Sequence, residues 1–172
     1  MGVFQTAQVL CSGPTLAEAI SALSGSGLDT LFLGVNRAVE AIECQYWVAI
    51  DWKTIDEGRP IGSPRIITIE TARQKLAGPV AKAYWTKGKR DDMPPEKMGW
   101  LNYSALLAIT AAYDLGCKRI EVYGADMAGV DDWDGKQVGR VCRTDQRWAK
   151  ERKQFDSLCE WMQGRGVKVT RI

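Results

Sequence analysis

Six short apolar runs along the chain have the length of β-strands. Most of them are continuously apolar rather than alternating with polar residues, which is typical of strands covered on both faces. The runs lie at residues 7–11, 30–35, 46–50, 65–69, 119–123 and 167–172. This pattern predicts a mostly parallel sheet of five to six strands.

Helical patterns alternate with these runs, at residues 16–23, 104–115 and 145–162. The second is apolar almost all round and is expected to be buried, whereas the third has one apolar stripe formed by Trp148, Phe155, Leu158 and Met162. Strands that alternate with helices predict an α/β fold with helices on both faces of the sheet. Since 172 residues suffice for one core, we expect a single Rossmann-like domain over residues 1–172.

The segment 78–100 interrupts this alternation with mixed charges, aromatic residues and the pair Pro94-Pro95. Irregular segments longer than about 12–15 residues in a compact domain are usually functional. We therefore predict a long loop or lid here, and the alternative is a surface excursion that contains a short helix.

The composition, 45% hydrophobic and 26% charged, is that of an ordinary globular protein. No apolar run approaches the roughly 20 residues that cross a bilayer, and the N-terminus lacks the pattern of a secretory signal. A net charge of +2 is too small to indicate a nucleic-acid partner. We expect a cytoplasmic protein with no nucleic-acid partner and no membrane span.

The chain contains five cysteines and no histidine. The cysteines are scattered singly, so zinc binding is not indicated, and we expect free thiols in a reducing compartment. Without histidine, any proton transfer near neutral pH has to use a carboxylate, cysteine, lysine or tyrosine.

The stretch Ser12-Gly13-Pro14-Thr15 joins the first predicted strand to a helix. Thr15 and Glu18 have the spacing of a capping box, which predicts a helix start at this point. Free backbone N–H groups at such a start favour an anion, and Gly13 would let a phosphate approach closely. The complete G-x-G-x-x-G and Walker patterns are missing, so a plain strand-to-helix turn is the slightly favoured alternative.

Three polar residues close predicted strands: Asn36, Asp51 and Asp126. Because parallel strands bring their carboxyl ends to one edge, these side chains are expected to lie at the ligand-binding edge of the sheet. Taken singly, Asn36 also fits a turn and Asp51 also fits a helix cap.

An acidic run and a basic cluster offer further candidates. The run Asp131-Asp132-Trp133-Asp134 has D-x-D spacing that could hold a divalent cation, although the following Gly135 favours a turn. Arg140, Arg143 and Arg147 could grip a phosphate or carboxylate, but such residues more often form a solvated helix face.

The segment YSALLAITAAYDLGCKRIEVYGADM, residues 103–127, together with CSGPTL at 11–16, resembles the bacterial sialyltransferases of glycosyltransferase family 42 and the wider group of MptE-like proteins, which includes archaeal hydroxymethylpterin diphosphokinases. In that family a G-[NS]-G-P-[ST]-L loop follows the first strand, and a later strand ends in G-x-D. The matching positions of this chain are Ser12, Gly13, Pro14, Thr15, Leu16, Asn36, Ser104, Gly116, Gly124 and Asp126.

The resemblance implies a Rossmann-like domain that binds a nucleotide or nucleotide sugar of the CMP type at the carboxyl edge of the sheet. The implied binding residues are Ser12, Gly13, Pro14, Thr15, Asn36, Asp51, Ser104, Gly124, Asp126 and Arg143. The family's proposed general base is a histidine, and this chain has Arg143-Thr144-Asp145-Gln146 in the corresponding region. Asp51, Asp126 and Asp145 are then the candidates for activating an acceptor hydroxyl.

Three hypotheses about function follow. The first is a nucleotide-sugar-dependent glycosyltransferase similar to sialyltransferases, without a resident metal or cofactor. The second is a diphosphotransferase in which the acidic run at residues 131–134 carries magnesium. The third is a binding or assembly protein without catalysis, of the kind that a phage could encode.

Overall fold

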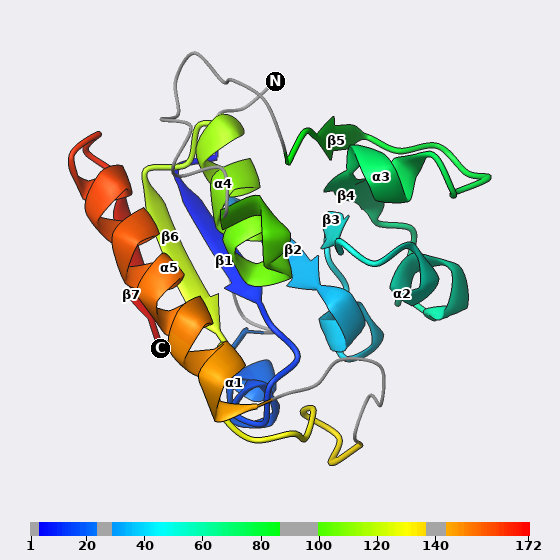
Figure 1. The fold of residues 1–172 in the computed structure, drawn as a ribbon, viewed down its shortest axis with the longest axis horizontal. Coiled ribbons are helices and arrows are strands. Elements are labelled where there is room, and N and C mark those ends of the chain that lie inside the picture. The colour runs from blue at the N-terminus through cyan, green and yellow to red at the C-terminus, as the bar shows by residue number, and fades with distance from the viewer. Residues whose placement is uncertain (1–3, 24–28, 87–99, 137–143) are drawn as a thin grey trace.

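The computed structural model describes residues 4–23, 29–86, 100–136 and 144–172 (Figure 1). These residues contain a seven-stranded sheet whose strands are all parallel, in the order β5-β4-β3-β2-β1-β6-β7. The strands are β1 (Thr6–Leu10), β2 (Thr30–Val35), β3 (Tyr46–Val48), β4 (Arg65–Ile69), β5 (Lys82–Tyr84), β6 (Arg119–Tyr123) and β7 (Lys168–Arg171). The expected α/β class is confirmed.

The predicted number of five to six strands was wrong, because β5 lies inside the segment 78–100 that was expected to be a loop. β5 is only three residues long and pairs with β4 through the register Ile67↔Lys82 and Ile69↔Tyr84. A run this short carries no periodic signal, so its strand conformation depends on pairing with β4. Residues 87–99, the greater part of the predicted lid, lie outside the described residues.

Helical elements connect the strands. They are α1 (Leu16–Leu23), the 3₁₀ helix η1 (Asn36–Glu40), α2 (Trp52–Glu57), α3 (Glu70–Arg73), α4 (Ser104–Asp114) and α5 (Asp145–Gln163). The three helices expected from the hydrophobic pattern correspond to α1, α4 and α5. None of the helices in the described parts of the chain combines the length and the apolar character needed to cross a bilayer.

The core has two parts, one on each face of the sheet. Successive β1 side chains point to opposite faces, so Val9 packs in the cluster that contains α4 and α5, whereas Leu10 packs in the cluster that contains Leu16 of α1. Figure 1 shows α4 and α5 lying side by side across one face. Trp161 of α5 makes edge-on ring contacts with Trp100 and Tyr113, at centroid distances of 5.7 and 5.4 Å, and so holds α5 against the α4 layer.

The connections that leave β1 and β6 diverge to opposite faces of the sheet. From β1 the chain enters α1 on one face, and from β6 it continues to α5 on the other face (Figure 1). β1 and β6 are direct neighbours, so the order of the strands reverses between them. In open α/β sheets a crevice forms at the carboxyl end of such a switch point, and ligands bind there.

Leu158 provides a test of how α5 is held on the sheet, because this side chain is fully buried. We expect Leu158→Ala to lower the free energy of unfolding by about 2–5 kcal/mol through lost burial and a residual cavity. Lys153→Ala removes an exposed side chain from the same helix and should change it by less than about 0.5 kcal/mol. Urea unfolding followed by circular dichroism measures both, and equal losses would contradict the packing described here.

Candidate functional site

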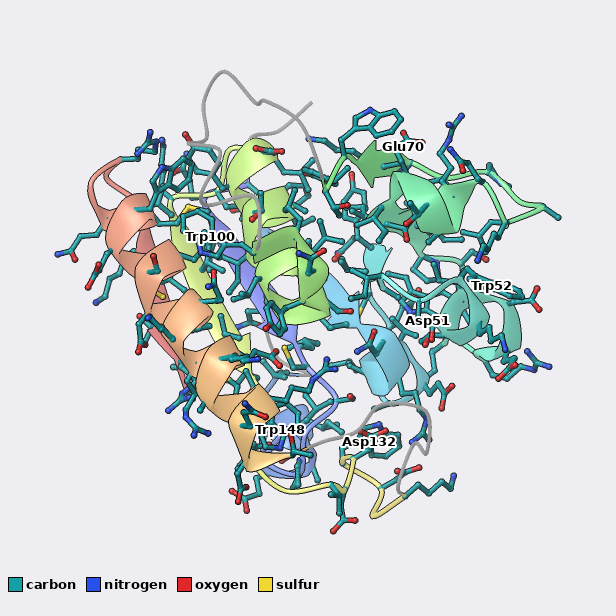
Figure 2. All side chains as sticks on the ribbon, in the orientation of Figure 1. Asp51, Trp52, Glu70, Trp100, Asp132 and Trp148 are labelled. Carbon is teal, nitrogen blue, oxygen red and sulfur yellow. The ribbon has the colours of Figure 1, made fainter. Side chains whose placement is uncertain are left out.

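Two adjoining cavities lie at the carboxyl edge of the sheet in the described part of the chain. The smaller, of about 130 Å³, is at the switch point between the loops that follow β1 and β6. The larger, of about 470 Å³, extends toward α2 and α3. Both are lined by Ser12, Asn36, Ser104, Asp132 and Arg147, so they form one continuous site. Figure 2 shows Trp148 and Asp132 beside the first part of this edge and Asp51 and Trp52 farther along it.

The loop after β1 is fastened to the loop after β6. The Gly13 N–H donates to the Gly124 carbonyl oxygen at 3.0 Å, and a Cβ at Gly13 would overlap that oxygen and the Asp126 carboxylate. Gly124 has a φ of +66°, and a Cβ there would overlap the Cys11 carbonyl oxygen. Glycine is required at both positions because the two backbones approach so closely.

Asp126 occupies the start of α1. Its carboxylate accepts from the Thr15 N–H at 3.2 Å and from the Thr15 hydroxyl at 2.8 Å. The Asp126 carboxylate therefore lies at the helix start where the sequence suggested a phosphate. Like a phosphate, it is a negative charge next to the positive end of the helix dipole. Neither Pro14 nor Thr15 lines either cavity, whereas Ser12 and Gly13 line the smaller one. The stretch from Ser12 to Thr15 therefore turns a corner at the edge of the site.

The acidic run after β6 forms a turn that is bound to the end of β2. Gly135 N–H donates to the Asp132 carbonyl oxygen at 2.9 Å. The Arg37 guanidinium donates to the Asp132 carboxylate at 3.0 Å and to the Asp134 carboxylate at 2.7 Å. The Asp132 side chain is only 1% exposed, and it also accepts from the Ser12 hydroxyl at 3.2 Å.

This arrangement does not fit a magnesium site. The two carboxylates with D-x-D spacing are both held by Arg37, and the hydrogen bond from Arg37 keeps the pKa of Asp134 well below its usual range. The same bond raises the pKa of the Arg37 guanidinium. Within the described residues no cluster of three or more potential metal ligands occurs. The run is a structural clamp between loops.

Arg147 is a cation of this site for which the described residues provide no carboxylate partner. It lies in the first turn of α5, where its backbone N–H donates to the Thr144 hydroxyl, and its side chain lines both cavities. Its guanidinium lies 5.9 Å from the centre of the Tyr103 ring. Across the part of the chain that the structure describes, its buried Nε has no acceptor and no carboxylate pairs with it. A buried N–H donor of this kind favours an anionic ligand.

The sequence offered Arg147 together with Arg140 and Arg143 as a basic cluster, and the resemblance singled out Arg143. Arg140 and Arg143 lie outside the described residues. The helical pattern holds the signal for Arg147, because Arg147 and Glu151 continue the buried stripe of Phe155 and Leu158 at i, i+4 spacing. This spacing turns both side chains toward the sheet edge. Glu151 is buried and lines the smaller cavity, and the sequence analysis did not identify this residue.

Ser104 and Asn36 stand where the sequence placed them, at the edge of the sheet. Ser104 opens α4, is 9% exposed, and its Oγ accepts from the Ile50 N–H at 3.4 Å. Asn36 has a φ of +52° and Met127 a φ of +49°, and these are the described non-glycine residues with positive φ. Both line the smaller cavity, and strained backbone of this kind gathers at functional sites.

The proposed catalytic carboxylates have different surroundings. Asp51 lines the larger cavity, and its Oδ1 caps α2 by accepting from the Lys53 N–H at 3.0 Å. Asp126 lines the smaller cavity but is bound to Thr15. Asp145 is exposed and lines neither cavity. Cys11 also lines the smaller cavity, and burial together with the charges of Glu151 and Asp126 raises the pKa of its thiol, so it is a neutral wall residue.

Neither the known protein-family models nor the curated proteins give a match to this sequence. Among solved structures, the thiamine pyrophosphokinase of Bacillus subtilis matches 97% of this chain with 16% sequence identity and a TM-score of 0.45. The chain spans 59% of the length of that protein. A likeness of this extent assigns no function to the chain.

The ion pairs of Arg37 with Asp132 and Asp134 provide a test with a defined pH dependence. We expect Arg37→Met to lower the free energy of unfolding by about 3 kcal/mol at pH 7, because it removes the cation that is bound to the buried carboxylate of Asp132. The pKa of Asp134 is lower in the folded chain than in the unfolded chain. The stabilisation from this shift is therefore complete above the unfolded carboxyl pKa of about 4 and disappears as the pH falls toward the folded pKa.

Urea unfolding at pH 7 and pH 3 should thus give a smaller difference between wild type and Arg37→Met at the lower pH. The control is Arg73→Met, which breaks a pair with Glu70 in which the arginine is 57% exposed. Such pairs contribute about 0.5 kcal/mol or less. A difference between wild type and Arg37→Met that does not change with pH would contradict the assigned role of Asp134.

Proposed function

We propose that the two adjoining cavities bind a nucleotide or nucleotide sugar of the CMP type, and that the chain is a glycosyltransferase that uses such a donor. The observation that carries the proposal is Arg147, a cation at the switch point of the sheet whose buried Nε has no acceptor among the described residues. Two buried serine side chains, Ser12 and Ser104, line the same cavity.

The phosphate of the ligand would lie in the smaller cavity. Arg147 supplies a planar, permanently charged donor, which suits phosphate oxygens. The Ser104 Oγ accepts from the Ile50 N–H, so its own proton can be donated to a phosphate oxygen. The Ser12 hydroxyl, by contrast, already donates to Asp132. A volume of about 130 Å³ accommodates a phosphate group but no complete nucleotide, so the rest of the ligand would extend into the larger cavity.

The larger cavity has the polar lining that a ribose or sugar requires. Its walls carry the hydroxyls of Thr54 and Thr71 and the amides of Asn36 and Asn102, together with the Trp52 ring. Small-molecule sites combine apolar walls with a few placed polar groups of this type. Together with the resemblance of the loop and strand-end motifs to sialyltransferases, this lining supports a nucleotide sugar over a simple phosphate ester.

Asp51 is the carboxylate that we assign as the base for an acceptor hydroxyl. Asp51 lines the larger cavity, and among the described residues only its Oδ1 has a hydrogen-bond donor. Its Oδ2 is therefore available to accept a proton from a sugar hydroxyl. Asp126 is less suited because both of its oxygens accept from Thr15, and Asp145 lies outside the cavities.

Calorimetric titration with CMP tests the phosphate site. We expect Arg147→Gln to weaken CMP binding by about tenfold or more, since a charge-assisted bond to phosphate is lost. Lys150→Gln removes an exposed positive charge one turn away and should weaken binding by less than about twofold. Titrations with and without magnesium should agree, and metal-dependent binding of the triphosphate would instead support a diphosphotransferase.

Asp51→Asn tests the assignment of the base. Asparagine caps helices as well as aspartate does, so α2 should keep its start, while the residue loses its basicity. We expect release of CMP from CMP-sialic acid to fall by about 100-fold with CMP affinity nearly unchanged. Tight CMP binding by the wild type without any turnover would contradict the transferase proposal and favour a non-catalytic binding protein.

A further inference from the structure

We propose that the larger cavity recognises a second anionic group of the ligand, through Lys75, and that an uncharged sugar segment separates this group from the phosphate at Arg147. The inference rests on the proposed function, because it takes Arg147 as the first anion site. It goes further by identifying a second binding residue and the charge pattern of the ligand.

Lys75 lines the larger cavity, and its ammonium group contacts an aromatic ring. Its ammonium Nζ lies 5.7 Å from the centre of the Trp52 ring, and both side chains line the cavity. The ring provides a cation–π contact, which orients the ammonium without neutralising its charge. Over the described ranges of the chain no carboxylate forms an ion pair with Lys75, so this charge remains for a ligand.

The other charged side chains that line the larger cavity have polar partners within the protein. Arg37 is bound by three carboxylates, those of Glu40, Asp132 and Asp134. Asp51 accepts from the backbone at the start of α2. Lys75 and Arg147 are therefore the two cationic side chains of this cavity without a carboxylate partner, within the residues that the structure describes.

The fold brings these two cations to the cavity from different segments of the chain. Arg147 belongs to the helix that follows β6, whereas Lys75 comes directly after α3, which follows β4. Strands β3, β2 and β1 lie between β4 and β6, and at about 4.8 Å per strand the axes of β4 and β6 are about 19 Å apart. Both side chains line the cavity, so a ligand that contacts both has to extend across it.

The other residues that line the larger cavity indicate which chemical group joins the two anionic groups of the ligand. It carries neutral hydroxyl and amide groups, those of Thr54, Asn36 and Asn102 among them. Such groups suit the hydroxyls of a ribose or another sugar. The geometry thus points to a ligand with a phosphate at one end, a sugar in the middle and a second phosphate or a carboxylate at the other end.

Titration with CMP and with cytidine 3′,5′-bisphosphate tests this inference, because the second compound differs only by a phosphate across the ribose. We expect the wild-type chain to bind the bisphosphate at least about tenfold more tightly than CMP. CDP carries its extra charge beside the first phosphate instead. Its affinity should therefore exceed that of CMP by a smaller factor than the affinity of the bisphosphate does.

Lys75→Gln should abolish the preference for the bisphosphate and leave CMP affinity unchanged. The matched control is Lys53→Gln: the Lys53 ammonium also lies 5.7 Å from the Trp52 ring centre, but Lys53 does not line the cavity. This variant removes the same charge and the same type of ring contact, and it should retain the preference.

The outcomes separate the two proposals. The second anion site is wrong, and the proposed function stands, if CMP binding depends on Arg147 but the bisphosphate binds no more tightly than CMP. The same conclusion follows if Lys53→Gln removes the preference for the bisphosphate as fully as Lys75→Gln does. If neither compound binds the wild-type chain, both proposals are overturned. Separate titrations with UDP-glucuronate and UDP-glucose test whether the second anionic group of the natural ligand is a carboxylate. Tighter binding of UDP-glucuronate that is lost in Lys75→Gln supports a carboxylate.

Discussion

The close approach of the loops after β1 and β6 is the constraint on which the site depends. The Gly13 N–H bonds to the Gly124 carbonyl oxygen, and neither position has space for a Cβ. Asp126 then reaches the start of α1 and bonds to Thr15 twice. These contacts hold the two loops together at the point where their chains diverge, and the smaller cavity is the space that remains between them.

Internal charge pairing decides which parts of the site can receive a ligand. The carboxylates of Asp126, Asp132 and Asp134 each have a partner within the protein, so they close the loops and offer little to a metal ion. Arg37 is neutralised in the same network. Arg147 and Lys75 lack carboxylate partners among the described residues, and the proposed ligand site depends on these two side chains.

The sequence predicted much of the framework and the general position of the site. Short, mostly continuous apolar runs predicted six of the strands, and helical patterns between them predicted α1, α4 and α5. Strand β5 was missed because three residues show no period, and their conformation depends on pairing with β4. Strand-end residues Asn36 and Asp51 were placed correctly at the sheet edge, since parallel strands bring their carboxyl ends together.

By itself, the sequence determined the α/β class, the corner at Gly13 and the placement of polar residues at one edge, because these follow from local periodicity and from short-range turn chemistry. Only the tertiary structure decided the role of each charge. Asp126, Asp132 and Arg37 meet their partners across separations of about 100 residues along the chain, and no local pattern encodes such pairs. For the same reason, the place of Arg147 at the cavity and the lack of a carboxylate partner for it among the described residues became visible only in the folded chain.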